Sequence, residues 1–382
     1  MTTPISHHIT AKTELEQRQA SWSELFFDLG FVAIIAQLTY MIIDGPKDLV
    51  AVLTFILLSY ITFWAWGRQT IIKNILPKED TVTRMMIIAQ TFCALIASIF
   101  VSTAIGSGAV GFALGIFGVK IILIGSIYYG YKLSPEHRPD DHSVNYAFFV
   151  SALLWFVSIF LPLFGAVMLW IIAQVIEAAA PYITTKNTDV IKLNKFHLPE
   201  RLGLFVMLVI GESLIVIGLI NKLALEKFDA ITIISFLLVF SIMASLWWIY
   251  FNINDVYLKG KRFPAVGRVL EFHNLLVIGI MLLAVGTQQV IKAPMAEVIG
   301  LGSFILWGGI AIFASIIGIR VIFHKDIFHA GRLLTVSLIV MGASLFMTLP
   351  IVWYLAIVTA VFFIVSARVI VDQGKFLENI KF

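Results

Sequence analysis

The sequence predicts an all-α, polytopic membrane protein with about twelve transmembrane helices, arranged as two parallel six-helix repeats. Three observations predict this class: the composition, the series of long apolar runs, and the placement of Lys and Arg between them. Of the 382 residues, 60% are hydrophobic and 13% are charged, whereas soluble domains carry about 25% charged residues. The single cysteine, Cys93, excludes a disulfide framework and a cysteine metal cluster. The protein therefore works within or across a bilayer.

The apolar runs have the length that a transmembrane helix needs, which is about 20 residues for a hydrocarbon core of about 30 Å. They are continuous, which favours helices over the short alternating strands of a β-barrel. The first series covers 22–43, 48–73, 82–104, 108–131, 143–162 and 163–184, and the second covers 199–221, 229–252, 266–290, 295–323, 331–349 and 350–371. These windows predict five parts: a polar tail at 1–21, a first repeat at 22–184, a linker at 185–198, a second repeat at 199–372, and a tail at 373–382. The polar start predicts a tail and not a cleavable signal peptide.

The basic residues alternate between the two sides of the predicted helices. The tails and the even-numbered loops hold 22 Lys and Arg, and the opposite loops hold 4. By the positive-inside rule, this asymmetry predicts that the tails and the linker are cytoplasmic. Because the basic residues are dispersed among short loops, no nucleic-acid partner is expected.

The two halves resemble each other when the sequence is shifted by 184 residues. Equivalent positions in the first three spans then carry similar polar or aromatic residues, and parallel repeats of this kind place a substrate or ion path between the halves. The equivalent pairs are Asp28 with Glu212, Trp64 with Trp248, and Arg84 with Arg268.

The first span carries two carboxylates, Glu24 and Asp28, four residues apart and therefore on one helix face. Ionisable groups inside membrane helices are costly and commonly mark functional sites. The alternative is that both are hydrated among lipid headgroups. Glu212 lies about ten residues into its own span, and its alternative is a carboxylate kept neutral by burial.

Lys120 is a lysine well inside a span, where it needs an acidic partner. Glu177 is the first candidate partner and Asp28 the second. Such a pair can fix helix packing without contacting a substrate, so a structural role and a functional role both stay open.

The ninth span opens with a dense polar segment, Arg268, Glu271, His273 and Asn274. Glu271 and Asn274 are three apart and can share a face, while His273 points elsewhere. His273 is a candidate for proton transfer, and its alternative is a hydrogen-bonded structural histidine.

Trp64 and Trp248 lie towards the predicted cytoplasmic ends of their helices. They fit either an aromatic belt at the membrane interface or the lining of a site. No nucleotide-binding or hydrolase motif occurs, so no cofactor and no metal are expected. The histidines of 137–142 are interpreted as a solvated loop.

Three segments carry a resemblance to a known family: Glu24-Leu-Phe-Phe-Asp-Leu-Gly-Phe-Val, Glu200-Arg-Leu-Gly-Leu-Phe-Val-Met-Leu-Val-Ile-Gly-Glu-Ser-Leu, and Leu246-Trp-Trp-Ile-Tyr-Phe. Together they resemble the bacterial low temperature requirement A family. The resemblance implies a multispanning protein of the bacterial inner membrane, named for a need during growth in the cold. More weakly, Phe27-Asp28 resembles the Phe-Ser-Asp signature of lysosomal and bacterial potassium channels, although the serine is missing here.

The sequence therefore favours a transporter or channel, not an enzyme, that passes a small solute or ion between the halves. Asp28 and Glu212 are expected nearest the path. The expected partners are the lipid bilayer and that solute, and homo-oligomerisation stays open. The alternatives are a membrane enzyme or lipid-handling protein that uses the carboxylates as acid and base, and a non-transporting scaffold needed in the cold.

Overall fold

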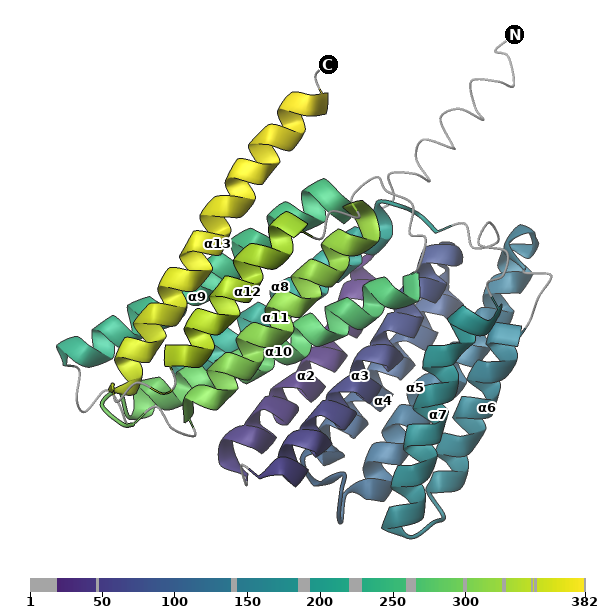
Figure 1. The fold of residues 1–382 in the computed structure, drawn as a ribbon. Coiled ribbons are helices and arrows are strands. Elements are labelled where there is room, and N and C mark those ends of the chain that lie inside the picture. The colour runs from purple at the N-terminus through teal and green to yellow at the C-terminus, as the bar shows by residue number, and fades with distance from the viewer. Residues whose placement is uncertain are drawn as a thin grey trace. The chain divides into compact units, whose positions relative to one another are not determined.

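The computed structural model describes residues 19–45, 48–138, 143–184, 193–219, 229–258, 266–297, 301–324, 328–344, 346 and 349–380. The first 18 residues and residues 185–192 of the predicted linker lie outside the described residues. The α-helices of the first half are α2 (Trp22–Asp44), α3 (Leu49–Ile75), α4 (Thr81–Phe100), α5 (Ala109–Leu133), α6 (Ser143–Ser158) and α7 (Leu163–Thr184) (Figure 1). Those of the second half are α8 (His197–Leu219), α9 (Ala230–Ile253), α10 (Val266–Lys292), α11 (Leu301–His324), α12 (Phe328–Ser344) and α13 (Ile351–Ile380).

The helices have the length and composition of membrane spans. Within the described ranges, nine segments are long and apolar enough to cross a bilayer, and no β-strand occurs there. The nine are Trp22–Asp44, Leu49–Ile75, Thr81–Thr103, Ala109–Leu133, Leu163–Ala180, His197–Gly218, Ala230–Ile253, Val266–Lys292 and Ile351–Arg368. The predicted class, an all-helical multi-pass membrane protein, is confirmed. The count of twelve spans, their repeat and the side of the tails stay predictions.

The packing divides the chain into two compact units. Unit 1 comprises Met1–Leu202 and Arg262–Leu270, and unit 2 comprises Gly203–Lys261 and Glu271–Phe382. In unit 1, α2 packs against α3 and α4, α5 packs against α4 and α6, and α6 packs against α7. In unit 2, α13 packs against α9 and α12, and α11 packs against α12. The predicted domain boundaries are not tested by this division.

Polar caps fix where the first helices begin. Ser21 and Glu24 form a capping box at α2, in which the Ser21 N–H donates to Glu24 Oε2 at 2.8 Å. Asp80 caps α4 through the Thr83 N–H. The Tyr129 hydroxyl also donates to Asp80 at 2.6 Å, and this bond, with the Thr83 N–H, lowers the pKa of the Asp80 carboxyl. The capping box sets the first turn of α2 and so directs Glu24 inward.

Glycines on α5 allow it to lie close against α4. A Cβ atom on Gly111 would lie 2.3 Å from the Phe100 ring, and one on Gly115 would lie 2.5 Å from the Ala97 backbone nitrogen. A Cβ atom on Gly118 would lie 2.6 Å from the Cys93 sulfur. Small residues at helix contacts are typical of membrane bundles, because they let two backbones approach.

We expect Gly115→Ala to destabilise the protein by about 1–3 kcal/mol, because the added methyl group forces α4 and α5 apart. The matched control is Gly125→Ala on the same helix, since no described atom of another helix lies within 4 Å of its Cβ position. The control should be neutral or slightly stabilising, because alanine favours a helix. Thermal unfolding of the detergent-purified variants measures both. Equal Tm values for the two variants would contradict the packing argument.

Candidate functional site

The two carboxylates of the first span both face the protein interior. Glu24 is 1% exposed and Asp28 is fully buried. Their spacing of four residues puts them one above the other on the same face of α2, as the sequence predicts. They therefore meet partners from other helices of unit 1 and not an open surface.

Those partners are two bases at the start of α8. The Arg201 Nη2 donates to Asp28 Oδ1 at 2.5 Å, and Arg201 Nη1 lies 3.2 Å from Glu24 Oε1. His197 Nε2 lies 3.3 Å from Glu24 Oε2. The acids are four residues apart and so are the bases, so the first turn of α8 runs parallel to α2. From α3, the Trp66 Nε1 also donates to Asp28 Oδ1, at 2.6 Å. We call Glu24, Asp28, Trp66, His197 and Arg201 the α2–α8 cluster.

The tautomer of His197 follows from its other neighbours. The Asn194 N–H donates to Asn74 Oδ1 at 2.7 Å, which fixes the orientation of the Asn74 amide. Asn74 Nδ2 then points at His197 Nδ1, 3.3 Å away. Because Nδ2 can only donate, Nδ1 must accept and carries no proton. His197 is therefore a neutral imidazole that donates its Nε2–H to Glu24.

One of the two carboxylate oxygens of Asp28 has no hydrogen-bond donor in the α2–α8 cluster. Asp28 Oδ1 accepts from both Arg201 and Trp66, whereas Asp28 Oδ2 is buried and has no hydrogen-bond partner within the described residues. A buried carboxylate oxygen without a donor is unfavourable unless something binds there. The oxygen is suited to hold a proton or a small cation, since a carboxylate is a hard anionic acceptor.

A second buried cluster lies on α3, α5, α6 and α7. Lys120 forms an ion pair with Glu177, so the first of its two predicted partners is confirmed and the alternative, Asp28, is wrong. The Ser151 hydroxyl donates to the same oxygen of Glu177. Arg68 interacts electrostatically with Glu177 from α3. We call Arg68, Lys120, Ser151 and Glu177 the α5–α7 cluster.

Helix α3 supplies both clusters from different faces. Trp66 and Asn74 face the α2–α8 cluster, whereas Arg68 faces Phe148 on α6. Two residues along a helix correspond to about 200°, so Trp66 and Arg68 must point to different sides. Burial of both faces of α3 in unit 1 follows from this arrangement.

Glu212 and Trp248, the predicted equivalents of Asp28 and Trp64 in the second half, have different surroundings from those two residues. Glu212 is half-buried, and it has no hydrogen bond or ion pair in the part of the chain that the structure describes. No atom of another helix lies within 4 Å of the position that a Cβ on the neighbouring Gly211 would take, so no helix packs closely there among the described residues. Trp64 is buried, whereas Trp248 is 44% exposed. A shared role for the equivalent residues therefore stays a prediction.

The polar segment of α10 is only partly buried. Arg268 is exposed and Glu271 is half-buried. His273 and Asn274 are buried, and the His273 ring lies edge-on to Tyr250 with ring centres 5.9 Å apart. His273 therefore packs in the interior of unit 2, as expected of a helix-embedded histidine, and its role in proton transfer stays a prediction.

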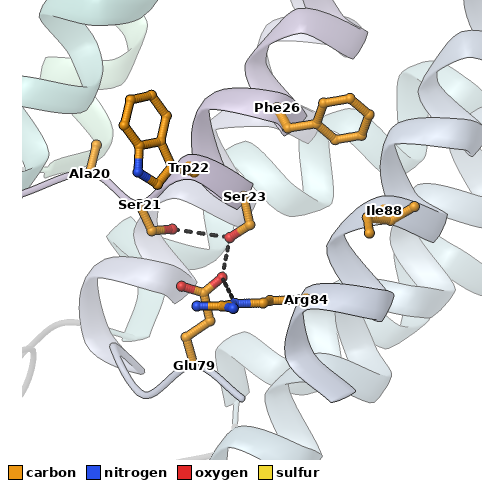
Figure 2. A pocket seen from close by; sticks show the side chains of 8 residues that line it. All are labelled: Ala20, Ser21, Trp22, Ser23, Phe26, Glu79, Arg84 and Ile88. Atoms are coloured by element: carbon orange, nitrogen blue, oxygen red, sulfur yellow. Dashed lines mark hydrogen bonds and ion pairs between the residues drawn. The ribbon is translucent and has the colours of Figure 1, made fainter. Parts of the chain in front are cut away.

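Arg84 lies on an open pocket of about 620 Å³ at the start of α2 and α4 (Figure 2). Its Nε lies 3.5 Å from Glu79 Oε1, and Glu79 also accepts from Ser23. The Arg84 side chain is 66% exposed. The pocket walls include Trp22 and Phe26, so this surface is mainly apolar around the Arg84–Glu79 ion pair. Within the described residues, no group of three His, Cys, Asp or Glu is arranged to hold a metal.

Comparison with known families decides what kind of protein carries these clusters. The model of the bacterial low temperature requirement A protein matches residues 19–367. The chain belongs to this family. It is also 26% identical, over 258 residues, to an uncharacterised protein of Rhizobium meliloti (strain 1021). That alignment covers 64% of this chain and 61% of the relative's own length.

The matched region of this low temperature requirement A protein contains both buried clusters. The family and the apolar helices together indicate a multi-pass protein of a bacterial membrane. His197, Arg201, Arg68 and Ser151 were not among the predicted site residues. A usable signal existed for two of them, because His197 and Arg201 repeat the four-residue spacing of Glu24 and Asp28 at the start of a span. Ser151 gave none, since serine is common in membrane helices.

Proposed function

We propose that this low temperature requirement A protein is a transporter or channel for a small solute or ion, with no enzymatic activity. The observation that carries the proposal is the fully buried Asp28, whose Oδ2 has no hydrogen-bond partner among the described residues. Ionisable groups inside membrane-spanning helices are rare and costly, and they typically line ion, proton or substrate paths.

In the proposed mechanism, Asp28 is the exchange point. Its Oδ1 is held by Arg201 and Trp66, so the side chain keeps its orientation while Oδ2 gains and loses a proton or a small cation. Binding at Oδ2 reduces the negative charge that holds Arg201, so occupancy weakens the Asp28–Arg201 pair. A change of this kind can couple ion binding to a movement of α8 relative to α2.

The topology that accompanies this proposal has twelve spans in two parallel six-helix repeats, with both termini cytoplasmic. The parallel course of α2 and the first turn of α8 supports it, because first and seventh spans enter from the same side in such an arrangement. The 22 to 4 asymmetry of basic residues supports a cytoplasmic location for that side. Glu24 and His197 then lie at the cytoplasmic ends of their helices.

Reconstitution tests the proposal. Purified protein in liposomes should dissipate imposed gradients of H⁺, Na⁺ or K⁺ faster than protein-free liposomes do, as measured with an enclosed pH-sensitive or ion-sensitive dye. We expect Asp28→Asn to abolish this flux, since the amide keeps the shape of the side chain but cannot bind a proton or a cation. Glu212→Gln tests whether Glu212 has a role equivalent to that of Asp28 or is only a buried structural carboxylate. Loss of flux in this variant supports equivalent roles for the two halves.

The matched control is Asp48→Asn, because Asp48 is an exposed N-cap and asparagine caps a helix equally well. Its flux should equal that of the unmodified protein. Thermal unfolding confirms that each variant is folded. Unchanged flux in folded Asp28→Asn removes Asp28 from the mechanism, and the absence of flux for every tested ion favours the scaffold alternative.

A further inference from the structure

The α5–α7 cluster contains more positive than negative charge. Arg68 and Lys120 are two buried cations; Glu177 forms an ion pair with Lys120 and interacts with Arg68 only electrostatically, at longer range. Their side chains come from α3, α5 and α7 and are 6%, 2% and 0% exposed. A buried group of three charges with an excess of one is unfavourable without a counter-charge.

The hydrogen bonds of the cluster show the same imbalance. Glu177 Oε1 accepts from both Lys120 and Ser151. Arg68 Nε and Nη2 are buried and have no acceptor among the described residues. One turn earlier on α3, Trp64 Nε1 has none either, and the same holds for Trp155 Nε1 on α6. Helices α3 and α6, which contribute to this cluster, therefore carry buried N–H donors that native interiors would normally satisfy.

Aromatic rings hold the two cations in place. The Arg68 guanidinium carbon lies 5.6 Å from the centre of the Phe148 ring, and Lys120 Nζ lies 5.2 Å from the same centre. Lys120 Nζ is also 6.0 Å from the Trp155 ring. Cation–π contacts stabilise a positive charge only partly, and they leave the N–H groups of Arg68 without a hydrogen-bond acceptor.

We propose that the α5–α7 cluster binds one small monovalent inorganic anion of the size of chloride. An anion supplies the two things that the cluster lacks: a negative charge that balances its excess positive charge, and an acceptor for the Arg68 N–H groups. A cation is disfavoured because Arg68 and Lys120 repel it, and a water molecule would satisfy donors without balancing charge. Arg68 is the main ligand, and Glu177 sets the affinity by repelling the anion. The inference is independent of the function proposed for Asp28.

Thermal unfolding of the full chain in detergent tests the site. The protein is titrated from sodium gluconate into sodium chloride or bromide at constant ionic strength. We expect Tm to rise with halide and to saturate, because a ligand that binds the folded state stabilises it. Arg68→Gln should lose the halide response. The matched control, Arg84→Gln, removes an exposed arginine and should keep it.

Glu177→Gln distinguishes an anion site from a purely structural cluster. Removing the carboxylate lowers the basal Tm in both cases, but an anion site should then bind halide about tenfold more tightly, equal to ~1.4 kcal/mol. Where Arg68→Gln does not fold, Arg68→Lys replaces it and should weaken the halide response, since it keeps the charge but loses the Nε donor. No halide-specific shift in the unmodified protein, or a weaker response in Glu177→Gln, overturns the proposal and leaves water as the occupant.

Discussion

Arg201→Gln is expected to destabilise the protein by about 3–5 kcal/mol, because it leaves buried carboxylates without their guanidinium partner. Arg201 contacts Asp28 at 2.5 Å and Glu24 at 3.2 Å, and it is itself fully buried. His197 cannot replace it as a cation, since its Nδ1 accepts from Asn74 and the ring is neutral. The measurement is the Tm of the detergent-purified variant, with chemical unfolding for the free energy.

Two further measurements make this prediction specific. Adding Asp28→Asn to Arg201→Gln should recover part of the lost stability, because the second change removes one of the buried charges. The loss in Arg201→Gln should also be smaller in mildly acidic than in alkaline buffer, since protonation neutralises the carboxylates. Arg84→Gln, which removes the partly exposed Arg84–Glu79 ion pair, should cost no more than about 1 kcal/mol. A similar loss for Arg84→Gln and Arg201→Gln would contradict the α2–α8 cluster.

Glu177→Leu is expected to cost a similar amount, about 3–5 kcal/mol, because it leaves Lys120 and Arg68 as two buried cations without a carboxylate. Ser151 also loses its acceptor. Lys120→Met should cost less, because Glu177 keeps Arg68 as a partner and methionine fills a similar volume. Chemical unfolding of the three proteins gives this order directly.

The order of the two losses is the informative result. If Lys120 and Glu177 were an isolated pair, removing either one would leave one buried charge and the two losses would be alike. A larger loss for Glu177→Leu therefore indicates that Arg68 belongs to the cluster. Equal losses, or a larger loss for Lys120→Met, would contradict the assignment of Arg68 to Glu177.

Several features of the site could be predicted because they depend on local geometry. Glu24 and Asp28 share a face since a helix repeats every 3.6 residues, and this holds whatever surrounds α2. The pairing of Lys120 with Glu177 was predictable as one of two alternatives, because few acids lie inside spans.

Other features could not be predicted because they depend on which helices meet. His197 contacts Glu24 and Arg201 contacts Asp28 across 173 residues of chain. The hydrophobic pattern of a membrane helix does not indicate its neighbours, since lipid and protein interiors are similarly apolar. For the same reason, the burial of Trp64 and the exposure of its predicted equivalent, Trp248, could not be distinguished from sequence.

The sequence by itself determined the class of the protein, because the thickness of a bilayer dictates the length of apolar runs and the cost of charge dictates their composition. It also determined which ionisable groups lie inside those runs. Only the tertiary structure decided how these groups combine, with Asp28 held by Arg201 and Trp66, and Glu177 shared by Lys120 and Arg68. The physical reason is that buried charges are satisfied by whichever helices pack together, and packing is a property of the whole bundle.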